Sequence, residues 1–289
     1  MNVRFILNPI SGGKRADLEY IAKCIELNFP GADMRLTKAP GHATQLAQEA
    51  AAQNFDVVIA MGGDGTINET ARGLVGTRTA LGIIARGSGN GFAREIGMHL
   101  PLEQALVKLQ RARVLVCDTG RVNGELFLNL AGVGIEAAIA WQFKEYGTRG
   151  MWPYFVIGTR TALSYKPKEL DVTFDGKQQI FRPLTLVFAN GKQYGSNFKI
   201  APEANLQDGL LDMVIVNDLP KWKLALSAPY FFTDKRRPFH ATDTVQVKKA
   251  VILHKGEILY HIDGEPRRTE NKLEIEIVPK SLRVLVPSL

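Results

Sequence analysis

A glycine-rich stretch with an acid at its centre is the clearest chemical signal in this chain. Residues 62–69 read Gly-Gly-Asp-Gly-Thr-Ile-Asn-Glu and follow the short apolar run 56–60, which is typical of a buried strand. After it, Ile67, Ala71 and Leu74 recur at helical spacing, so the stretch is expected on a strand-to-helix turn. Glycines let a ligand approach the main chain, and N–H groups at a helix start suit phosphate oxygens. The stretch therefore predicts a phosphate-binding loop.

The acid in this loop, Asp64, narrows the chemistry. A carboxylate repels phosphate unless a cation or a transferable proton is present. This favours a nucleotide handled with a divalent metal, or an acid that contacts the hydroxyl being phosphorylated. A second glycine loop, 86–91, reads Arg-Gly-Ser-Gly-Asn-Gly and follows another apolar run, 81–85. Two such loops in a strand-loop-helix context favour phosphate binding over a simple connecting turn.

Composition limits the partners. The 289 residues carry 36 basic and 29 acidic side chains, and the net charge of +7 favours an anionic partner such as a nucleotide, an anionic membrane surface or nucleic acid. No aromatic-interleaved basic array is present, so nucleic acid is not expected. The only cysteines, Cys24 and Cys117, lack metal-ligand spacing and fit a reducing compartment. The N-terminus lacks a signal-peptide pattern and no apolar run approaches the ~20 residues of a membrane span, so we expect a cytoplasmic protein, soluble or peripheral at the inner membrane surface.

The first part of the chain alternates strands and helices. Strands are predicted at 3–7, 33–37, 56–60 and 81–85, and helices at 17–28, 44–53 and 102–109. This alternation up to about residue 113 is typical of a Rossmann-like parallel α/β sheet that binds ligands at the carboxyl ends of its strands.

The second part reads differently, because strand-like runs punctuated by turn residues dominate it. They lie at 114–122, 125–130, 170–174, 184–189, 210–216, 244–247, 251–253, 258–262, 272–278 and 282–286. Helical segments are expected near 155–164 and 221–232. The predicted fold class is therefore α/β plus all-β, with an N-terminal parallel α/β nucleotide-binding domain and a C-terminal antiparallel β-sandwich domain.

The motifs at 8–13, 62–69, 87–93 and 263–266 occur in an order that resembles the diacylglycerol-kinase-type lipid kinases. That family includes bacterial diacylglycerol and phosphatidylglycerol kinases, sphingosine kinases and ceramide kinases. The resemblance spans nearly the whole chain, since the intermediate segments 118–123, 132–134 and 202–212 also match. It implies an ATP-binding catalytic domain of residues 1–118 plus 279–289, to which the last strand returns, and a lipid-binding β-sandwich domain of residues 119–278.

The resemblance also implies a set of site residues. Glu265 would be the general base, and Asp64 would orient or charge-balance the reacting centre. The ATP contacts would be Asn8, Thr37, Gly62, Gly63, Asp64, Gly65, Thr66, Ile67, Asn68 and Ser88. A structural Mg²⁺ would be held by Asn205, Asp208 and the carbonyl of Leu210, oxygen ligands that suit this ion. The alternative for that segment is a simple Asp-Gly turn joining two strands.

The expected activity is transfer of the γ-phosphate of ATP to a lipid hydroxyl, with diacylglycerol converted to phosphatidic acid. Many bacterial diacylglycerol kinases have an acid where Gly91 stands, and the form found here is more like sphingosine and ceramide kinases, so a ceramide or sphingoid-base kinase is the alternative. Glu136 does not match the amine-binding acid of sphingosine kinases, which weighs against a free long-chain base. Further alternatives are an NAD kinase, disfavoured by the second glycine loop, and a non-catalytic lipid-binding protein, disfavoured by Asp64 and Glu265.

Two segments combine aromatic and basic residues in a way that suits an anionic membrane interface. They are 140–160, with Trp141, Trp152 and Arg160, and 221–237. Ordinary core packing with a solvated basic face is the alternative for each. The expected partners are thus ATP, a membrane lipid substrate and an anionic membrane surface, and the oligomeric state stays open, with a homodimer among the options.

Overall fold

The computed structural model describes residues 1–11, 17–87, 89–146, 158, 161, 164–195, 197–233 and 238–288. By its internal contacts the chain divides into two units. The first comprises Met1–Asp118 and Pro279–Leu289, and the second comprises Thr119–Val278. Asp118 accepts a hydrogen bond from the backbone N–H of Lys280 at 2.7 Å, which ties the outgoing and returning segments of the first unit together.

The first unit is built on a parallel sheet. Its strands lie in the order β4-β3-β1-β2, and the end of the long last strand β14 (Glu265–Val286) joins β4 in parallel at Val284 and Leu81. Their bounds are β1 (Val3–Leu7), β2 (Asp33–Leu36), β3 (Val57–Gly62) and β4 (Ala80–Ala85). The three apolar strands β1, β3 and β4 are almost wholly buried, as expected for strands covered on both faces.

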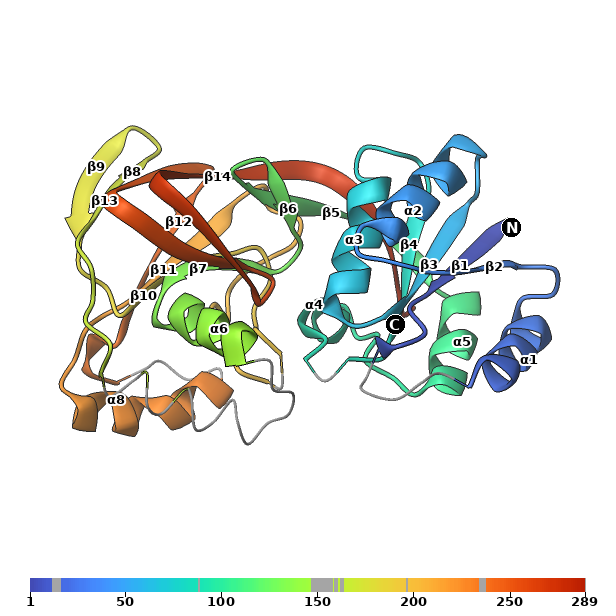
Figure 1. The fold of residues 1–289 in the computed structure, drawn as a ribbon, viewed down its shortest axis with the longest axis horizontal. Helices are drawn as coiled ribbons and strands as arrows, with labels where there is room; N and C mark the ends of the chain where they lie inside the picture. Colours follow the sequence, from blue (N-terminus) through green and yellow to red (C-terminus); the bar gives the residue numbers. More distant parts are fainter. Residues whose placement is uncertain are drawn as a thin grey trace. The chain divides into compact units, whose positions relative to one another are not determined.

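Helices cover both faces of this sheet (Figure 1), with α2 and α3 on one side and α1 and α5 on the other. Their bounds are α1 (Leu18–Asn28), α2 (His42–Ala52), α3 (Asp64–Leu74), the short α4 (Gly91–Glu95) and α5 (Leu102–Gln110). The predicted parallel α/β half is confirmed. Because the strands are parallel, the residues that follow them share one edge of the sheet, and both glycine loops lie there.

The second unit is an antiparallel β structure. Its main path runs β12-β11-β10-β7-β13-β14, β8 and β9 extend from β13, and β5 pairs with β14 and β6. The strands are β5 (Arg113–Val122), β6 (Glu125–Phe127), β7 (Leu130–Gly134), β8 (Leu170–Phe174), β9 (Lys177–Phe181), β10 (Thr185–Ala189), β11 (Leu211–Val216), β12 (Thr242–Val247) and β13 (Lys249–Ile262). The helical segments are α6 (Ile135–Tyr146), α8 (Lys221–Ser227), η2 (Ala228–Phe232) and η3 (Pro238–His240). The predicted antiparallel second half is confirmed.

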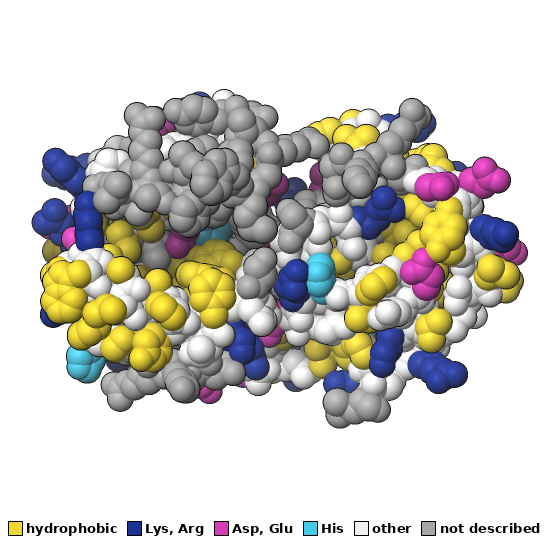
Figure 2. All heavy atoms as spheres, turned by 90° about the horizontal axis from the view of Figure 1, so that it is seen from below, with side chains coloured by type: hydrophobic (Ala, Val, Ile, Leu, Met, Phe, Trp, Pro, Cys, Tyr) yellow, Lys and Arg dark blue, Asp and Glu magenta, His cyan; other side chains and the backbone are white. Residues whose placement is uncertain are grey.

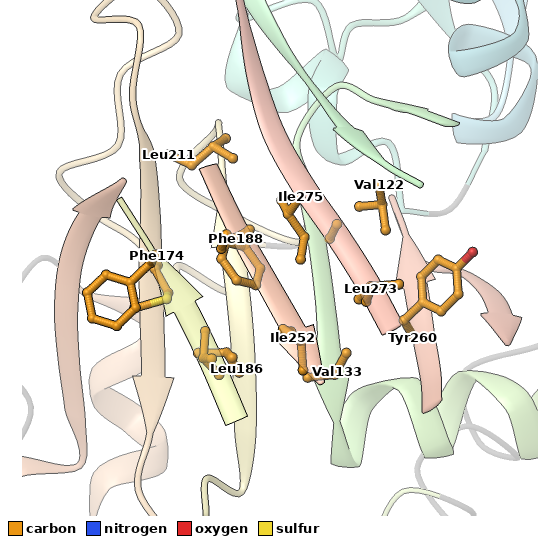
Figure 3. Packing of buried hydrophobic residues seen from close by; sticks show 14 of the residues in the cluster. Val122, Val133, Phe174, Leu186, Phe188, Leu211, Ile252, Tyr260, Leu273 and Ile275 are labelled. Carbon is orange, nitrogen blue, oxygen red and sulfur yellow. The ribbon is translucent and has the colours of Figure 1, made fainter. Parts of the chain in front are cut away.

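A large apolar cluster forms the core of this unit (Figure 3). Phe188 of β10, Ile252 of β13 and Leu273 of β14 all belong to it, although they lie far apart in the sequence. Each such side chain contributes roughly 1.5–3 kcal/mol when it leaves water, so the cluster is a main source of the stability of this unit.

Some predicted elements differ from the observed ones. The runs 251–253 and 258–262 belong to one strand, β13, because its pairing with β14 continues beyond a register shift between Leu253 and Glu257. The runs 272–278 and 282–286 likewise belong to β14. The run 125–130 is divided into β6 and β7. Helix α6 and the polar strand β9 were not predicted, since neither carries a clear apolar periodicity.

Three hairpins of the second unit turn through two residues with positive φ, as type I′ turns require. The turn pairs are Asn123-Gly124, Asp175-Gly176 and Asp263-Gly264, with φ between 45° and 87°. The last of these connects β13 to β14 and makes Glu265 the first residue after the turn. The position of this acid is thus set by the shortest kind of hairpin.

Candidate active site

The first glycine loop forms the start of helix α3. Strand β3 ends at Gly62, Gly63 is the N-cap, and the first helical hydrogen bond runs from Ile67 N–H to the Gly63 carbonyl at 3.1 Å. The backbone N–H groups at Asp64, Gly65 and Thr66 therefore precede the intrahelical ladder, where a helix presents its partial positive charge. A Cβ atom added at Gly65 would meet no atom within 4 Å, so the main chain there is open to a ligand.

The acid of this loop is bonded to the second glycine loop. One oxygen of Asp64 accepts the N–H of Asn90 at 2.8 Å, and the other accepts the N–H of Gly91 at 2.9 Å. Asn90 and Gly91 are themselves buried, and they open helix α4. Carboxylate bonds to backbone N–H groups are among the stronger hydrogen bonds in proteins. Asp64 therefore fixes the two loops relative to each other.

The two loops also approach through their main chains. A Cβ atom at Gly87 would lie 2.9 Å from Gly63 Cα and 2.7 Å from Asn90 Oδ1, distances that real side chains do not tolerate. The Asn90 side-chain oxygen accepts the Gly87 N–H at 3.1 Å and holds the second loop in its bend. Position 87 therefore requires glycine, because the main chains of the two loops come too close there for a side chain. Ser88, predicted to contact ATP, lies outside the described residues.

Two more predicted nucleotide-contact residues lie on the same sheet edge. Asn8, directly after β1, donates from Nδ2 to Thr66 Oγ1 at 3.2 Å, which links the first strand end to helix α3. Thr37, directly after β2, donates its N–H to the Leu7 carbonyl at 2.9 Å. The edge thus gathers the ends of β1, β2, β3 and β4.

Three residues in α3 are less accessible than the sequence interpretation assumed. Ile67 is in the core with its N–H in the helix ladder, and Thr66 and Asn68 are buried, with Asn68 Oδ1 accepting from Arg72 at 3.2 Å. Ile67 serves packing in this structure. Contacts of these three residues with a nucleotide remain predictions.

A histidine and an arginine support the second loop, and no sequence pattern singles out either of them. Arg94 donates from Nε to the Gly89 carbonyl at 3.1 Å, and its Nη2 lies 2.8 Å from His99 Nε2. Partial burial and then the charge of Arg94 lower the pKa of His99, so the neutral ring can accept from the arginine. No spacing pattern marks His99, because its role depends on the fold of the loop.

In the second unit, Asp263 fixes the turn that carries Glu265. Its carboxylate accepts the backbone N–H groups of Leu128, Asn129 and Leu130 at 2.8–3.0 Å. Leu128 and Asn129 form the link between β6 and β7, and Leu130 starts β7, which explains why the run 125–130 is divided there. Glu265 itself is exposed to solvent, and its role as general base remains a prediction.

Beneath the same turn lies a polar pair, the buried His261 and the partly buried Glu136. His261 Nε2 is 3.4 Å from Glu136 Oε1, and His261 Nδ1 accepts the Gly264 N–H at 3.4 Å. Burial, and secondly the negative charge of Glu136, raise the pKa of Tyr165 to about 12. Helix α6 supplies Glu136, so this helix and the turn are connected through His261.

Comparisons with known proteins agree with this arrangement. Residues 2–122 match the model of the diacylglycerol kinase catalytic domain, and residues 129–286 match that of the YegS C-terminal NAD kinase beta sandwich-like domain. The chain is 33% identical over 224 residues to a diacylglycerol kinase of Bacillus subtilis (strain 168). The aligned region covers 74% of this chain and 73% of that protein. The chain belongs to the diacylglycerol-kinase-type family of lipid kinases.

Further relatives cover almost the whole kinase. It is 30% identical over 288 residues to a protein of Klebsiella pneumoniae (strain 342) named probable lipid kinase YegS-like, covering 96% of this chain and 95% of that one. A solved structure, a diacylglycerol kinase from Bacillus anthracis str. Sterne, shares the fold with a TM-score of 0.77 at 23% identity, covering 99% of this chain and 96% of that chain. The predicted family, fold class and kinase activity are confirmed.

The segment predicted to hold a structural Mg²⁺ is a turn at the entry to β11. Asn205 Oδ1 accepts the Gln207 N–H at 3.1 Å, and Asp208 Oδ1 accepts the Leu210 N–H at 3.0 Å. It is not a hairpin turn, because β10 ends at Ala189 and a long loop intervenes. The amide, carboxylate and carbonyl oxygens fit Mg²⁺ in kind. They also form a turn bonded within itself, so the metal site remains a prediction.

A buried acid beside this turn adds to its negative charge. Burial first, and then the charges of Asp208 and Glu203, raise the pKa of Asp212. Among the described residues, Asp212 Oδ2 has no hydrogen-bond partner. The charges of Asp208 and Glu203 thus disfavour the ionised form of Asp212, and a cation bound here would oppose their effect. No helix in the described part of the kinase has the length and apolar character needed to cross a membrane.

Proposed function

We propose that this lipid kinase transfers the γ-phosphate of ATP to the hydroxyl of diacylglycerol, giving phosphatidic acid and ADP. The observation that carries the proposal is the pair of glycine loops at one sheet edge, joined by Asp64, with open main chain at Gly65. Phosphoryl transfer depends mainly on positioning and charge neutralisation, and such a cradle can supply both.

In the proposed reaction the N–H groups at the start of α3 hold phosphate oxygens of ATP. Mg²⁺, when bound with ATP, would neutralise charge that builds up on the transferred group. The lipid hydroxyl oxygen forms the new bond to the γ-phosphorus while the bond to the ADP oxygen breaks. Glu265 accepts the hydroxyl proton, and its exposed position after the Asp263-Gly264 turn supports this role.

Diacylglycerol is preferred as acceptor because the Bacillus subtilis relative carries that activity in its name. A ceramide or sphingoid-base kinase is the second candidate, because Gly91 stands in the second loop. A free sphingoid amine would need an available acid. Glu136 is instead directed at the buried His261, which supports the first candidate.

We further propose that the kinase works at the anionic inner surface of a membrane, because its substrate is a lipid and its net charge is +7. Asn205, Asp208 and the Leu210 carbonyl would hold a second, structural Mg²⁺. Asp208→Ala should then lower turnover with little change in ATP affinity.

The test is a labelled-ATP assay with diacylglycerol, phosphatidylglycerol, ceramide, sphingosine and NAD, each with and without Mg²⁺. Lipids are presented in mixed micelles and NAD in solution. The expected result is Mg²⁺-dependent labelling with diacylglycerol as the best acceptor. A kcat/KM for ceramide or sphingosine that is higher than the kcat/KM for diacylglycerol would show that diacylglycerol is not the preferred acceptor. Labelling of NAD alone would contradict the proposed reaction.

A further inference from the structure

One face of the second unit exposes a concentration of large apolar side chains. Trp222, Leu226, Phe232 and Phe239 are 59%, 56%, 54% and 40% exposed, and all come from α8, η2 and η3. We call these four residues the α8 patch. Figure 2 shows hydrophobic side chains gathered on the face that carries α8, which lies at the lower left of Figure 1. Contiguous apolar surface of this kind marks an interaction site.

The patch is held in place from beneath, so its exposure is a property of the fold. Phe231 is buried and stacks on Phe198 with 5.0 Å between ring centroids, and its carbonyl accepts the Lys199 N–H at 2.6 Å. Ser227 is buried, and its hydroxyl donates within α8 to the Lys223 carbonyl at 2.9 Å. The contacts of Phe231 fix the segment to the unit, and the four patch residues stay exposed.

The outward side chains are ordered relative to one another. The rings of Trp222 and Phe239 meet edge to face at 5.8 Å, and Lys223 Nζ lies 5.5 Å and 5.6 Å from their centroids. Leu226 stands one helical turn after Trp222, on the same side of α8. An aromatic side chain, a leucine and a lysine on one short helix can insert together into the headgroup region of a bilayer.

The charged side chains on α8 itself are both basic. They are Lys221 and Lys223, and residues 219–233 contain no acid, although Asp218 and Asp234 flank that stretch. We infer that the α8 patch docks the kinase on an anionic membrane surface, with the apolar side chains inserted and the two lysines at the phosphates. This inference rests on the proposed function in that the acceptor is a membrane lipid. A second copy of the chain is a poorer occupant, because a symmetric contact through this face would oppose the lysines of both copies.

Vesicle co-sedimentation at low salt tests the inference directly. We expect binding to phosphatidylcholine vesicles that contain phosphatidylglycerol, and weak binding to phosphatidylcholine alone. Trp222→Ala with Leu226→Ala should weaken binding at least about tenfold, since two inserted apolar side chains are lost. Lys221→Gln with Lys223→Gln should weaken it by roughly tenfold or more, an effect that disappears at high salt. Ile180→Ala on β9, an equally exposed apolar residue outside the patch, is the matched control.

A second measurement does not depend on truncating the patch. The chain has three tryptophans, and in a variant that keeps only Trp222, brominated phosphatidylcholine mixed with phosphatidylglycerol should quench its fluorescence on binding. Unquenched Trp222 in vesicle-bound protein would overturn the inference, as would undiminished vesicle binding of the Trp222 and Leu226 double variant. Equal binding to neutral vesicles would overturn the anionic surface as the partner.

The kinase assay separates this inference from the proposed function. With lipid in detergent micelles, the double variant should phosphorylate at the wild-type rate, because the patch takes no part in the reaction. If vesicle binding depends on the α8 patch but the wild type phosphorylates no lipid, the docking inference is supported and the proposed function is contradicted. If the wild type dimerises in sedimentation and the double variant does not, the patch is a contact between copies and the inference fails.

Discussion

The carboxylate of Asp64 accepts the backbone N–H groups of both Asn90 and Gly91, at 2.8 Å and 2.9 Å. An acid that the sequence marks for the reacting centre is therefore also the residue that holds the second glycine loop. Substitution of Asp64 should alter structure and activity together, and only a measurement of both can distinguish the two roles.

Asp64→Asn should lower the melting temperature as well as turnover. The asparagine amide turns its NH₂ group toward the N–H of either Asn90 or Gly91, so one buried N–H loses its acceptor. This should lower the free energy of unfolding by about 1–3 kcal/mol. Thermal unfolding and the kinase assay measure the two effects. Asp56→Asn is the control, since Asp56 also accepts a backbone N–H, from Asn2 at 2.6 Å, but at an exposed position. Unchanged melting with normal turnover would remove Asp64 from both roles.

Glu265→Gln should lower kcat by about 10²–10⁴-fold, the usual contribution of a general base. Its melting temperature should stay near that of the wild type, because Glu265 is exposed and the Asp263-Gly264 turn is retained. Glu270→Gln is the matched control, an exposed glutamate on the same strand. Normal kcat in Glu265→Gln, or an equal loss in the control, would exclude this residue as the base.

Gly65→Ala should separate folding from nucleotide binding. The new methyl group meets no protein atom within 4 Å, and alanine is favoured over glycine in a helix by up to about 1 kcal/mol. We expect an unchanged or raised melting temperature without ATP, and weaker ATP binding by isothermal titration, because the phosphates would occupy the same space. ATP affinity equal to that of the wild type would place the phosphates elsewhere.

Gly87→Ala, in contrast to Gly65→Ala, is predicted to destabilise the fold in the absence of nucleotide. Its methyl group would lie 2.9 Å from Gly63 Cα, so the two loops must separate. The melting temperature should fall before any ligand is added. A stable Gly87→Ala variant would show that the two loops can move apart at little cost.

Asp212→Asn should raise stability at neutral pH. The raised pKa of Asp212 means that the folded state binds this proton more tightly than the unfolded chain, whose carboxyl has the usual value of 3.8. Stability from this group is present below that value and is lost as pH rises through the folded pKa. The melting temperature of the variant should therefore exceed that of the wild type at pH 7, and the difference should shrink on acidification.

Excess magnesium chloride provides a second measurement on the same pair of proteins. If a cation binds at Asn205 and Asp208, its charge should relieve the repulsion at Asp212 and narrow the difference at pH 7. The melting curves with and without the salt decide this. Equal melting of variant and wild type at pH 7 without the salt would contradict the destabilising role of Asp212.

Local patterns were sufficient for several parts of this protein. Alternating apolar runs predicted the parallel first half and the antiparallel second half, because burial on one or both faces determines residue order along each strand. The stretch 62–69 was placed correctly between a strand and a helix, since glycines and an apolar run are both local signals. Asp263-Gly264 likewise encodes its own two-residue turn through positive φ.

Tertiary structure decided which distant groups act on one another. Asp64 and Asn90 lie 26 positions apart and meet because β3 and β4 are neighbours in the sheet. His261 and Glu136 lie 125 positions apart and meet because β13 pairs with β7, which leads directly into α6. Periodicity reports that a side chain faces the interior. It cannot report its partner, because strand order is chosen by the packing of the whole chain.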